Sequence, residues 1–153
     1  MLRIGVIADT HGMLRPQALA SLAGSDYIVH GGDIGNPRIL EQLRAIAPLT
    51  VVRGNNDRQD WAAEVLHSAV LDLGEVRLCA VHAIATLDID PVAAGVQVVV
   101  YGHSHSPKAV WRAGVLYRHP GSAGPRRFKL PVSVAQLLVD GASVTARVIE
   151  LAV

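Results

Sequence analysis

Short apolar runs alternate with amphipathic stretches over the first third of the chain. Residues 2–8, 26–30 and 49–53 are apolar runs of strand length, which predicts three buried strands. Residues 16–24 begin with a proline and end on a glycine, and residues 36–48 start with Asn-Pro and carry one apolar stripe, so both predict helices. Strands that alternate with helices predict a parallel sheet with right-handed crossovers.

The second half of the chain has a different pattern. Residues 69–81, 109–119 and 132–151 each contain two strand-like stretches around a pair of residues that includes glycine, which predicts three hairpins. Residues 96–101 form an apolar run that predicts a strand buried on both faces. We therefore expect an α/β protein in which two mixed sheets pack face to face with helices outside. No linker or repeat interrupts the pattern, so residues 1–153 are predicted to form a single domain.

Composition excludes several classes of protein. Half of the residues are hydrophobic and 18% are charged, which argues against disorder. The net charge of +1 provides no broad positive field, so we expect no stable nucleic-acid binding. No apolar run approaches the ~18 residues of a membrane-spanning helix, and we expect a cytoplasmic protein without membrane contact. The single cysteine, Cys79, excludes an internal disulfide.

Metal-ligating side chains follow directly after the predicted strands. These residues are Asp9, His11, Asp33, Asn55, His82, His103 and His105. The binding crevice of an open α/β sheet lies beyond the carboxyl ends of its strands, so we expect them to converge. His103 and His105, one residue apart after an apolar strand, can both face one point beyond the strand end.

The number and chemistry of these donors indicate the kind of site. Seven nitrogen and oxygen donors exceed the three or four protein ligands of a single zinc ion, and they suit two ions that share a bridging carboxylate. Imidazole, carboxylate and amide donors without thiolate favour manganese, iron, zinc, nickel or cobalt, without choosing among them. Asp9 alone would suit a strand-end cap and Asp33 alone a turn, but separate caps do not explain seven such residues in this order.

Five motifs in order resemble the calcineurin-like metallophosphoesterases. They are Asp9-x-His11, Gly32-Asp33, Gly54-Asn55, His82 and Gly102-His103-Ser104-His105. The short chain, the Gly-Asn-x-Asp form at 54–57 and the Pro-Gly-Ser at 120–122 are similar to the small prokaryotic, YfcE-type phosphodiesterase branch of that family. The resemblance implies a four-layer α/β/β/α sandwich.

The resemblance also implies a role for each ligand. Asp9, His11 and His105 would hold one divalent ion. Asn55, His82 and His103 would hold the other, and Asp33 would bridge the two. Mn²⁺ is the expected metal, with Ni²⁺, Zn²⁺, Fe²⁺ and Co²⁺ as alternatives. Such a centre would hydrolyse small phosphodiesters by a metal-activated hydroxide.

Other residues are expected to support or modify this site. We predict that Asp57 and His30 orient the ligands or anchor their loops from behind. Asn56 stands where larger family members have a histidine; it can donate a hydrogen bond to phosphate but cannot act as a general acid. Ala83 stands where the family has a glycine, and His119 stands where it has an asparagine. His119 could contact the substrate or be an ordinary loop residue.

Two other classes of protein share part of this pattern. The first is a non-catalytic interaction module on the same fold, like the retromer subunit that resembles this family. Such a module is expected to have lost metal ligands, but all seven candidate ligands are present here. The substitutions at Asn56 and Ala83 keep this alternative open. The second is a metallo-β-lactamase, which would need an H-x-H-x-D-H cluster. Here His103 and His105 are followed by Ser106-Pro107-Lys108, so the cluster is incomplete.

The expected partner is a small phosphodiester substrate of unspecified identity. The short segment between His82 and Val96 leaves little room for a specificity cap, so an open site is expected. Assembly into a homo-oligomer stays open because the hairpin at 132–151 can leave an exposed strand edge.

Overall fold

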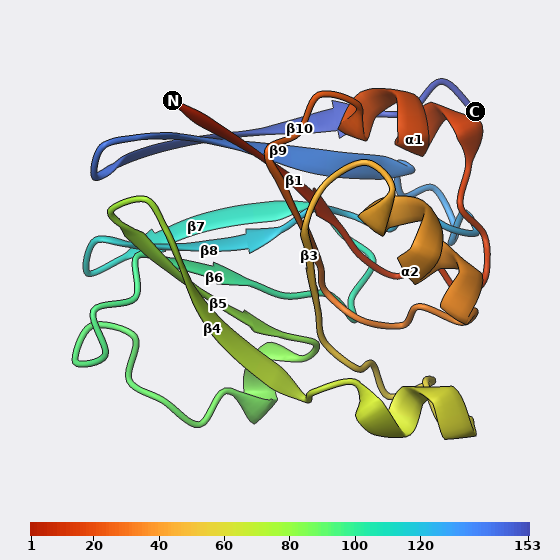
Figure 1. The fold of residues 1–153 in the computed structure, drawn as a ribbon, viewed down its shortest axis with the longest axis horizontal. Coiled ribbons are helices and arrows are strands. Elements are labelled where there is room, and N and C mark those ends of the chain that lie inside the picture. Colours follow the sequence, from red (N-terminus) through yellow and green to blue (C-terminus); the bar gives the residue numbers. More distant parts are fainter.

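Two five-stranded sheets form the centre of the molecule (Figure 1). The structure is a computed structural model that describes residues 1–153. The first sheet has the strand order β10-β9-β1-β2-β3 and comprises β1 (Leu2–Ile7), β2 (Tyr27–His30), β3 (Leu49–Val51), β9 (Ser133–Asp140) and β10 (Ser143–Glu150). The second has the order β4-β5-β6-β8-β7 and comprises β4 (Ser68–Leu73), β5 (Val76–Val81), β6 (Val98–Val100), β7 (Lys108–Arg112) and β8 (Val115–His119).

Each sheet contains three mutually parallel strands and two further strands that join it by antiparallel pairing. In the first sheet β1, β2 and β3 are parallel, and β9 pairs antiparallel with both β1 and β10. In the second, β5, β6 and β8 are parallel, while β4 and β7 pair antiparallel at the two edges. The predicted strands, the three hairpins and the two mixed sheets are confirmed.

Two α-helices cover one face of the first sheet, α1 (Pro16–Leu22) and α2 (Pro37–Arg44) (Figure 1). The side chain of Asn36 accepts a hydrogen bond from the Arg38 amide and caps α2, as its place before Pro37 predicts. Two short 3₁₀ helices, η1 (Asp60–Glu64) and η2 (Ile84–Thr86), were not predicted, because three to five residues are too few to show a helical period.

The apolar side chains pack in three clusters that define four layers. A cluster of 14 buried residues fills the space between the sheets, and one of 13 lies between the first sheet and the helices. A third cluster of five lies on the outer face of the second sheet, under Leu87, Ile89 and Ala94. The predicted α/β/β/α sandwich is therefore confirmed, although its last layer is a loop with η2 in place of an α-helix.

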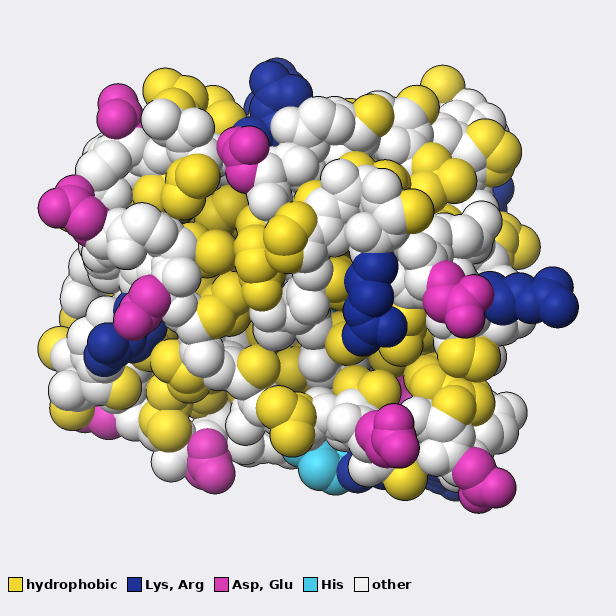
Figure 2. Space-filling model, viewed as in Figure 1, with side chains coloured by type: hydrophobic (Ala, Val, Ile, Leu, Met, Phe, Trp, Pro, Cys, Tyr) yellow, Lys and Arg dark blue, Asp and Glu magenta, His cyan; other side chains and the backbone are white.

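On the face of the molecule viewed in Figure 1 and Figure 2, apolar side chains gather near the middle, and charged side chains lie around them, some of them well inside the rim. A hollow of about 790 Å³ runs along β3, α2 and η1, and none of the seven candidate ligands lines it. No helix in the chain combines the length and apolar character needed to cross a membrane.

Candidate metal centre

The seven candidate ligands follow the carboxyl ends of β1, β2 and β3, which are parallel in the first sheet, and of β5 and β6, which are parallel in the second. Five of them have a positive φ: Asp9 (55°), His11 (47°), Asp33 (55°), His103 (80°) and His105 (65°). This left-handed conformation costs a non-glycine residue ~1–2 kcal/mol, and such residues gather at functional sites. Only two other non-glycine residues share it, Ala113 and Phe128, so the strain concentrates on the ligands.

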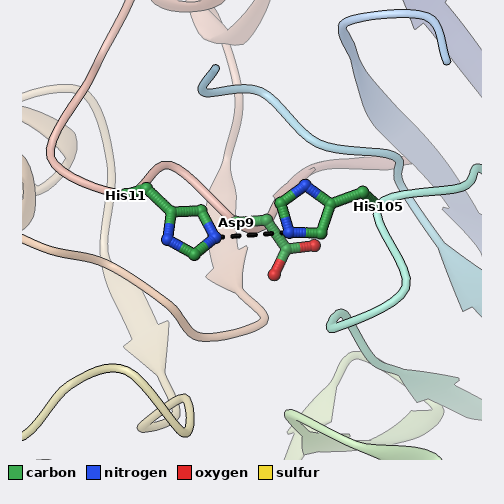
Figure 3. Close-up of side chains that lie close together, drawn as sticks. All are labelled: Asp9, His11 and His105. Carbon is green, nitrogen blue, oxygen red and sulfur yellow. Dashed lines mark hydrogen bonds between the residues drawn. The ribbon is translucent and has the colours of Figure 1, made fainter. Parts of the chain in front are cut away.

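The first group of ligands consists of Asp9, His11 and His105. Their ligand atoms all lie within 4.8 Å of one another. His11 Nε2 lies 3.3 Å from His105 Nε2, and Figure 3 shows the two rings turned toward each other beside the Asp9 carboxylate. Burial lowers the pKa of His11 and, with Arg127, lowers that of His105 to about 4. Both rings are therefore neutral near pH 7, the form that binds metal.

The second group is formed by Asn55, His82 and His103 around the Asp33 carboxylate. His82 Nε2 lies 2.9 Å from Asn55 Oδ1 and 3.3 Å from Asp33 Oδ2. His103 Nδ1 lies 3.2 Å from the same Asn55 oxygen. Asp9 also comes within 4.8 Å of Asp33 and His82, so the two groups adjoin.

The orientation of His82 fits a metal ligand. Its Nδ1 donates a hydrogen bond to the Gly31 carbonyl at 2.7 Å, which leaves Nε2 to face the oxygens of Asn55 and Asp33. Burial lowers the pKa of His82, but Asp33 and the Gly31 carbonyl outweigh that effect and raise it. The same oxygens that favour a proton on Nε2 also favour a metal cation beside this nitrogen.

Asp33 lies between the two groups. Its Oδ2 is 3.5 Å from His11 Nε2 and 3.3 Å from His82 Nε2, so one carboxylate oxygen faces both groups. Burial raises the pKa of Asp33, but hydrogen bonds from His82 and Asn56 outweigh burial and hold it below its ordinary value. Burial also raises the pKa of Asp9, to about 7.

Asn56 contacts the carboxylate of Asp33. Its backbone amide donates to Asp33 Oδ1 at 2.9 Å, and its side-chain amide donates to Asp33 Oδ2 at 3.1 Å. The side chain therefore orients Asp33 in this structure, while contact with a substrate phosphate stays a prediction. Ala83 has φ −113°, an ordinary extended conformation, so the loss of the family's glycine introduces no backbone strain there.

Asp57 joins two loops of the site. Its carboxylate accepts three backbone hydrogen bonds, from Ile34 at 3.0 Å, Gly35 at 3.0 Å and Gly54 at 2.9 Å. The first two donors follow Asp33, and the third precedes Asn55. Asp57 therefore ties the loop that carries Asp33 to the loop that carries Asn55.

Replacing Asp57 with alanine is expected to lower the free energy of unfolding by about 3 kcal/mol, because three backbone amides, two of them buried, lose a charged acceptor at once. Urea denaturation of the metal-stripped protein measures this loss. Asp60→Ala, a nearby exposed carboxylate without such contacts, is the control and should change stability by less than ~0.5 kcal/mol. Equal stability of the two variants would contradict the anchoring role.

Two buried histidines support the loop after β1. His30 Nε2 lies 3.0 Å from Thr10 Oγ1, and the Thr10 hydroxyl donates to the Ile34 carbonyl at 2.9 Å, so His30 contacts the residue between two ligands rather than a ligand. His119 ends β8, and its Nε2 lies 3.6 Å from Asp9 Oδ2. The approach of His119 to Asp9 was not predicted from the sequence. The available signal was a histidine at a strand end two residues before a glycine, a spacing that His30 shares.

A polar cavity of about 420 Å³ opens beside the second group. Asn55 and His82 form part of its wall, and Arg53, His67, Thr86 and Asp88 supply most of its other polar side chains. Arg53 and His67 are hydrogen-bonded to each other. The cavity therefore places the guanidinium group of Arg53 and several hydrogen-bonding side chains next to the candidate metal ligands.

Known proteins share both sequence and fold with this chain. The calcineurin-like phosphoesterase superfamily domain matches residues 2–142. A probable metallophosphoesterase of Methanothermobacter thermautotrophicus is 30% identical, over 96% of this chain and 91% of its own length.

Two solved structures illustrate the shared fold. An archaeal phosphodiesterase superposes with a TM-score of 0.78 at 18% identity, over 97% of this chain and 100% of its own. Vps29 of Entamoeba histolytica in complex with Zn²⁺ superposes with a TM-score of 0.75 at 18% identity, over 97% and 99% of the two chains. Together with the ligand geometry, the sequence matches place this chain in the calcineurin-like phosphoesterase superfamily, a family of metal-dependent enzymes.

Proposed function

We propose that the chain is a phosphodiesterase that uses two divalent metal ions to hydrolyse small phosphodiesters. The observation that carries this proposal is the position of Asp33, whose Oδ2 lies within 3.5 Å of one imidazole from each ligand group. A carboxylate in that position suits a bridge between two ions. Mn²⁺ is the metal we propose, and histidine, carboxylate and amide donors without thiolate suit it as they suit iron, zinc, nickel and cobalt.

When bound, two such ions neutralise phosphoryl oxygens and make a water molecule more acidic. The protein residues then have positioning roles. Asp9, His11 and His105 would hold one ion, and Asn55, His82 and His103 the other. Asn56 orients the bridging carboxylate through two hydrogen bonds. Because its amide cannot supply a proton to a leaving group, this site suits esters whose leaving groups depart as anions.

The cavity beside Asn55 favours a diester over a monoester. At about 420 Å³ it has room for the second ester substituent of a small phosphodiester, which a monoester lacks. Asn55 and His103 are exposed, so the substrate can approach from solvent. Arg53 and Asp88 in the cavity wall suit a polar substituent.

The test is hydrolysis of bis-p-nitrophenyl phosphate and p-nitrophenyl phosphate by metal-stripped protein to which Mn²⁺ is added. The proposal predicts turnover that depends on metal and a kcat/KM at least ~10-fold higher for the diester; this ratio corresponds to ~1.4 kcal/mol of transition-state binding. A higher kcat/KM for the monoester would contradict the diesterase assignment. Metal binding by folded protein without turnover of either ester would support a non-catalytic interaction module with a retained metal site.

A further inference from the structure

His119 is a buried histidine that the proposed reaction does not use. Its side chain is fully buried, and its Nε2 faces Asp9 Oδ2 across 3.6 Å. Both atoms are buried, and neither has a hydrogen-bond partner. Buried polar atoms without partners are rare in folded proteins. His119 Nε2 and Asp9 Oδ2 are two such atoms that face each other, and Asp9 is a candidate metal ligand, so their pairing requires a functional explanation.

The hydrogen bond at the other ring nitrogen of His119 determines where the ring carries its proton. The Gly121 amide donates to Nδ1 at 2.9 Å, so Nδ1 supplies a lone pair and the hydrogen of the neutral ring is on Nε2. Gly121 has φ 87°, and a Cβ there would lie 1.9 Å from Ser133 Oγ, so only glycine fits this turn. Tyr101 packs edge-on against the ring, with centroids 5.2 Å apart. The N–H therefore points at the Asp9 carboxylate.

The same arrangement occurs once more in this chain, at His30. The Gly32 amide donates to His30 Nδ1 at 3.0 Å, and Gly32 has φ 98°. His30 Nε2 then contacts Thr10 Oγ1 at 3.0 Å. His30 ends β2 of the first sheet and His119 ends β8 of the second, so each sheet directs one histidine N–H at the loop that follows β1.

We propose that His119 is a positioning residue for Asp9, which it orients by donating its Nε2 hydrogen to Asp9 Oδ2. A movement of roughly 0.5 Å would bring the pair within hydrogen-bonding distance. Asp9 Oδ1 already accepts the His103 amide at 3.2 Å. Because Asp9 Oδ1 then accepts from the His103 amide and Oδ2 from His119, the carboxylate keeps one orientation toward His11 and His105. This inference rests on the metal site of the proposed function.

The test is the affinity of metal-stripped protein for Mn²⁺, measured by calorimetry without substrate. His119→Phe removes the donor, and we expect it to weaken the tighter site by ~10–100-fold. His119→Gln retains an N–H donor at a similar distance from the backbone, and its affinity for Mn²⁺ should stay within ~3-fold of the wild type. His30→Phe is the matched control: it makes the same change beside Thr10, which is not a ligand, and should weaken binding by less than ~10-fold.

Nitrogen-15 NMR of the wild-type imidazoles provides a readout that does not depend on how the variants fold. It should show hydrogen on His119 Nε2, and hydrogen on Nδ1 would overturn the proposal. Equal losses of affinity in His119→Gln and His119→Phe, or unchanged affinity in His119→Phe, would overturn it as well. Failure of the wild type to bind Mn²⁺ would instead contradict the proposed function itself.

Discussion

Substitution of Asp33 by asparagine is expected to abolish turnover and to lower the metal content of the protein from two ions per chain to one or fewer. The change keeps the shape of the side chain but removes the negative charge that faces both His11 and His82. One preorganised electrostatic contact is worth ~10²–10³-fold in rate, and this carboxylate serves both ligand groups, so we expect a loss of at least ~10³-fold.

The measurement for Asp33→Asn combines metal analysis after equilibration with Mn²⁺ and kcat/KM on bis-p-nitrophenyl phosphate. Asp72→Asn is the control, because Asp72 is an exposed carboxylate on β4 paired with Arg77, outside the ligand groups. The control should behave as the wild type. Two bound ions and undiminished turnover in Asp33→Asn would show that Asp33 does not bridge the centre.

Substitution of Gly54 by alanine is expected to disrupt the site through a steric clash. A Cβ at Gly54 would lie 2.1 Å from Asp33 Oδ1 and 2.2 Å from the Asp33 backbone nitrogen. Because one of these neighbours is backbone, relief requires the loops after β2 and β3 to separate. Such overpacking costs ~3 kcal/mol of folding free energy. The separation would also break the hydrogen bond from the Gly54 amide to Asp57.

We expect Gly54→Ala to weaken Mn²⁺ binding by more than ~100-fold, well beyond the effect of losing a supporting contact. Calorimetry of the metal-stripped variant and its urea denaturation together measure both losses. Gly114→Ala is the control: its Cβ would meet nothing within 4 Å, but its φ of 78° predicts a cost of ~1 kcal/mol without loss of metal affinity. Wild-type affinity in Gly54→Ala would contradict the packing described here.

Much of the fold was predictable because its signals are local. Apolar runs of strand length, the Asn36-Pro37 helix start and the glycine-containing turns each depend on a few neighbouring residues. The convergence of the seven candidate ligands was predictable for a topological reason: β1, β2 and β3 run parallel in one sheet, and β5 and β6 in the other. Their carboxyl ends therefore bring together residues far apart in sequence.

The remaining features depend on contacts between distant segments. The sequence indicates a histidine at position 119 but not its approach to Asp9, which requires β1 and β8 to meet across the two sheets. The hydrogen bonds from Asn56 to Asp33 depend on the close approach of the loops after β2 and β3. The left-handed conformations of Asp9 and Asp33 could not be predicted, because aspartate adopts this conformation only occasionally and tertiary contacts decide where it does.

The central claim, a phosphodiesterase centre with two metal ions that share Asp33, is tested most directly by the number of ions that turnover requires. Metal-stripped protein at a concentration far above the dissociation constant is titrated with Mn²⁺ while hydrolysis of bis-p-nitrophenyl phosphate is followed. Two ions that share Asp33 predict a rate that reaches its maximum at two equivalents of Mn²⁺ per chain. A maximum at one equivalent, or turnover by protein shown to contain no metal, would contradict it.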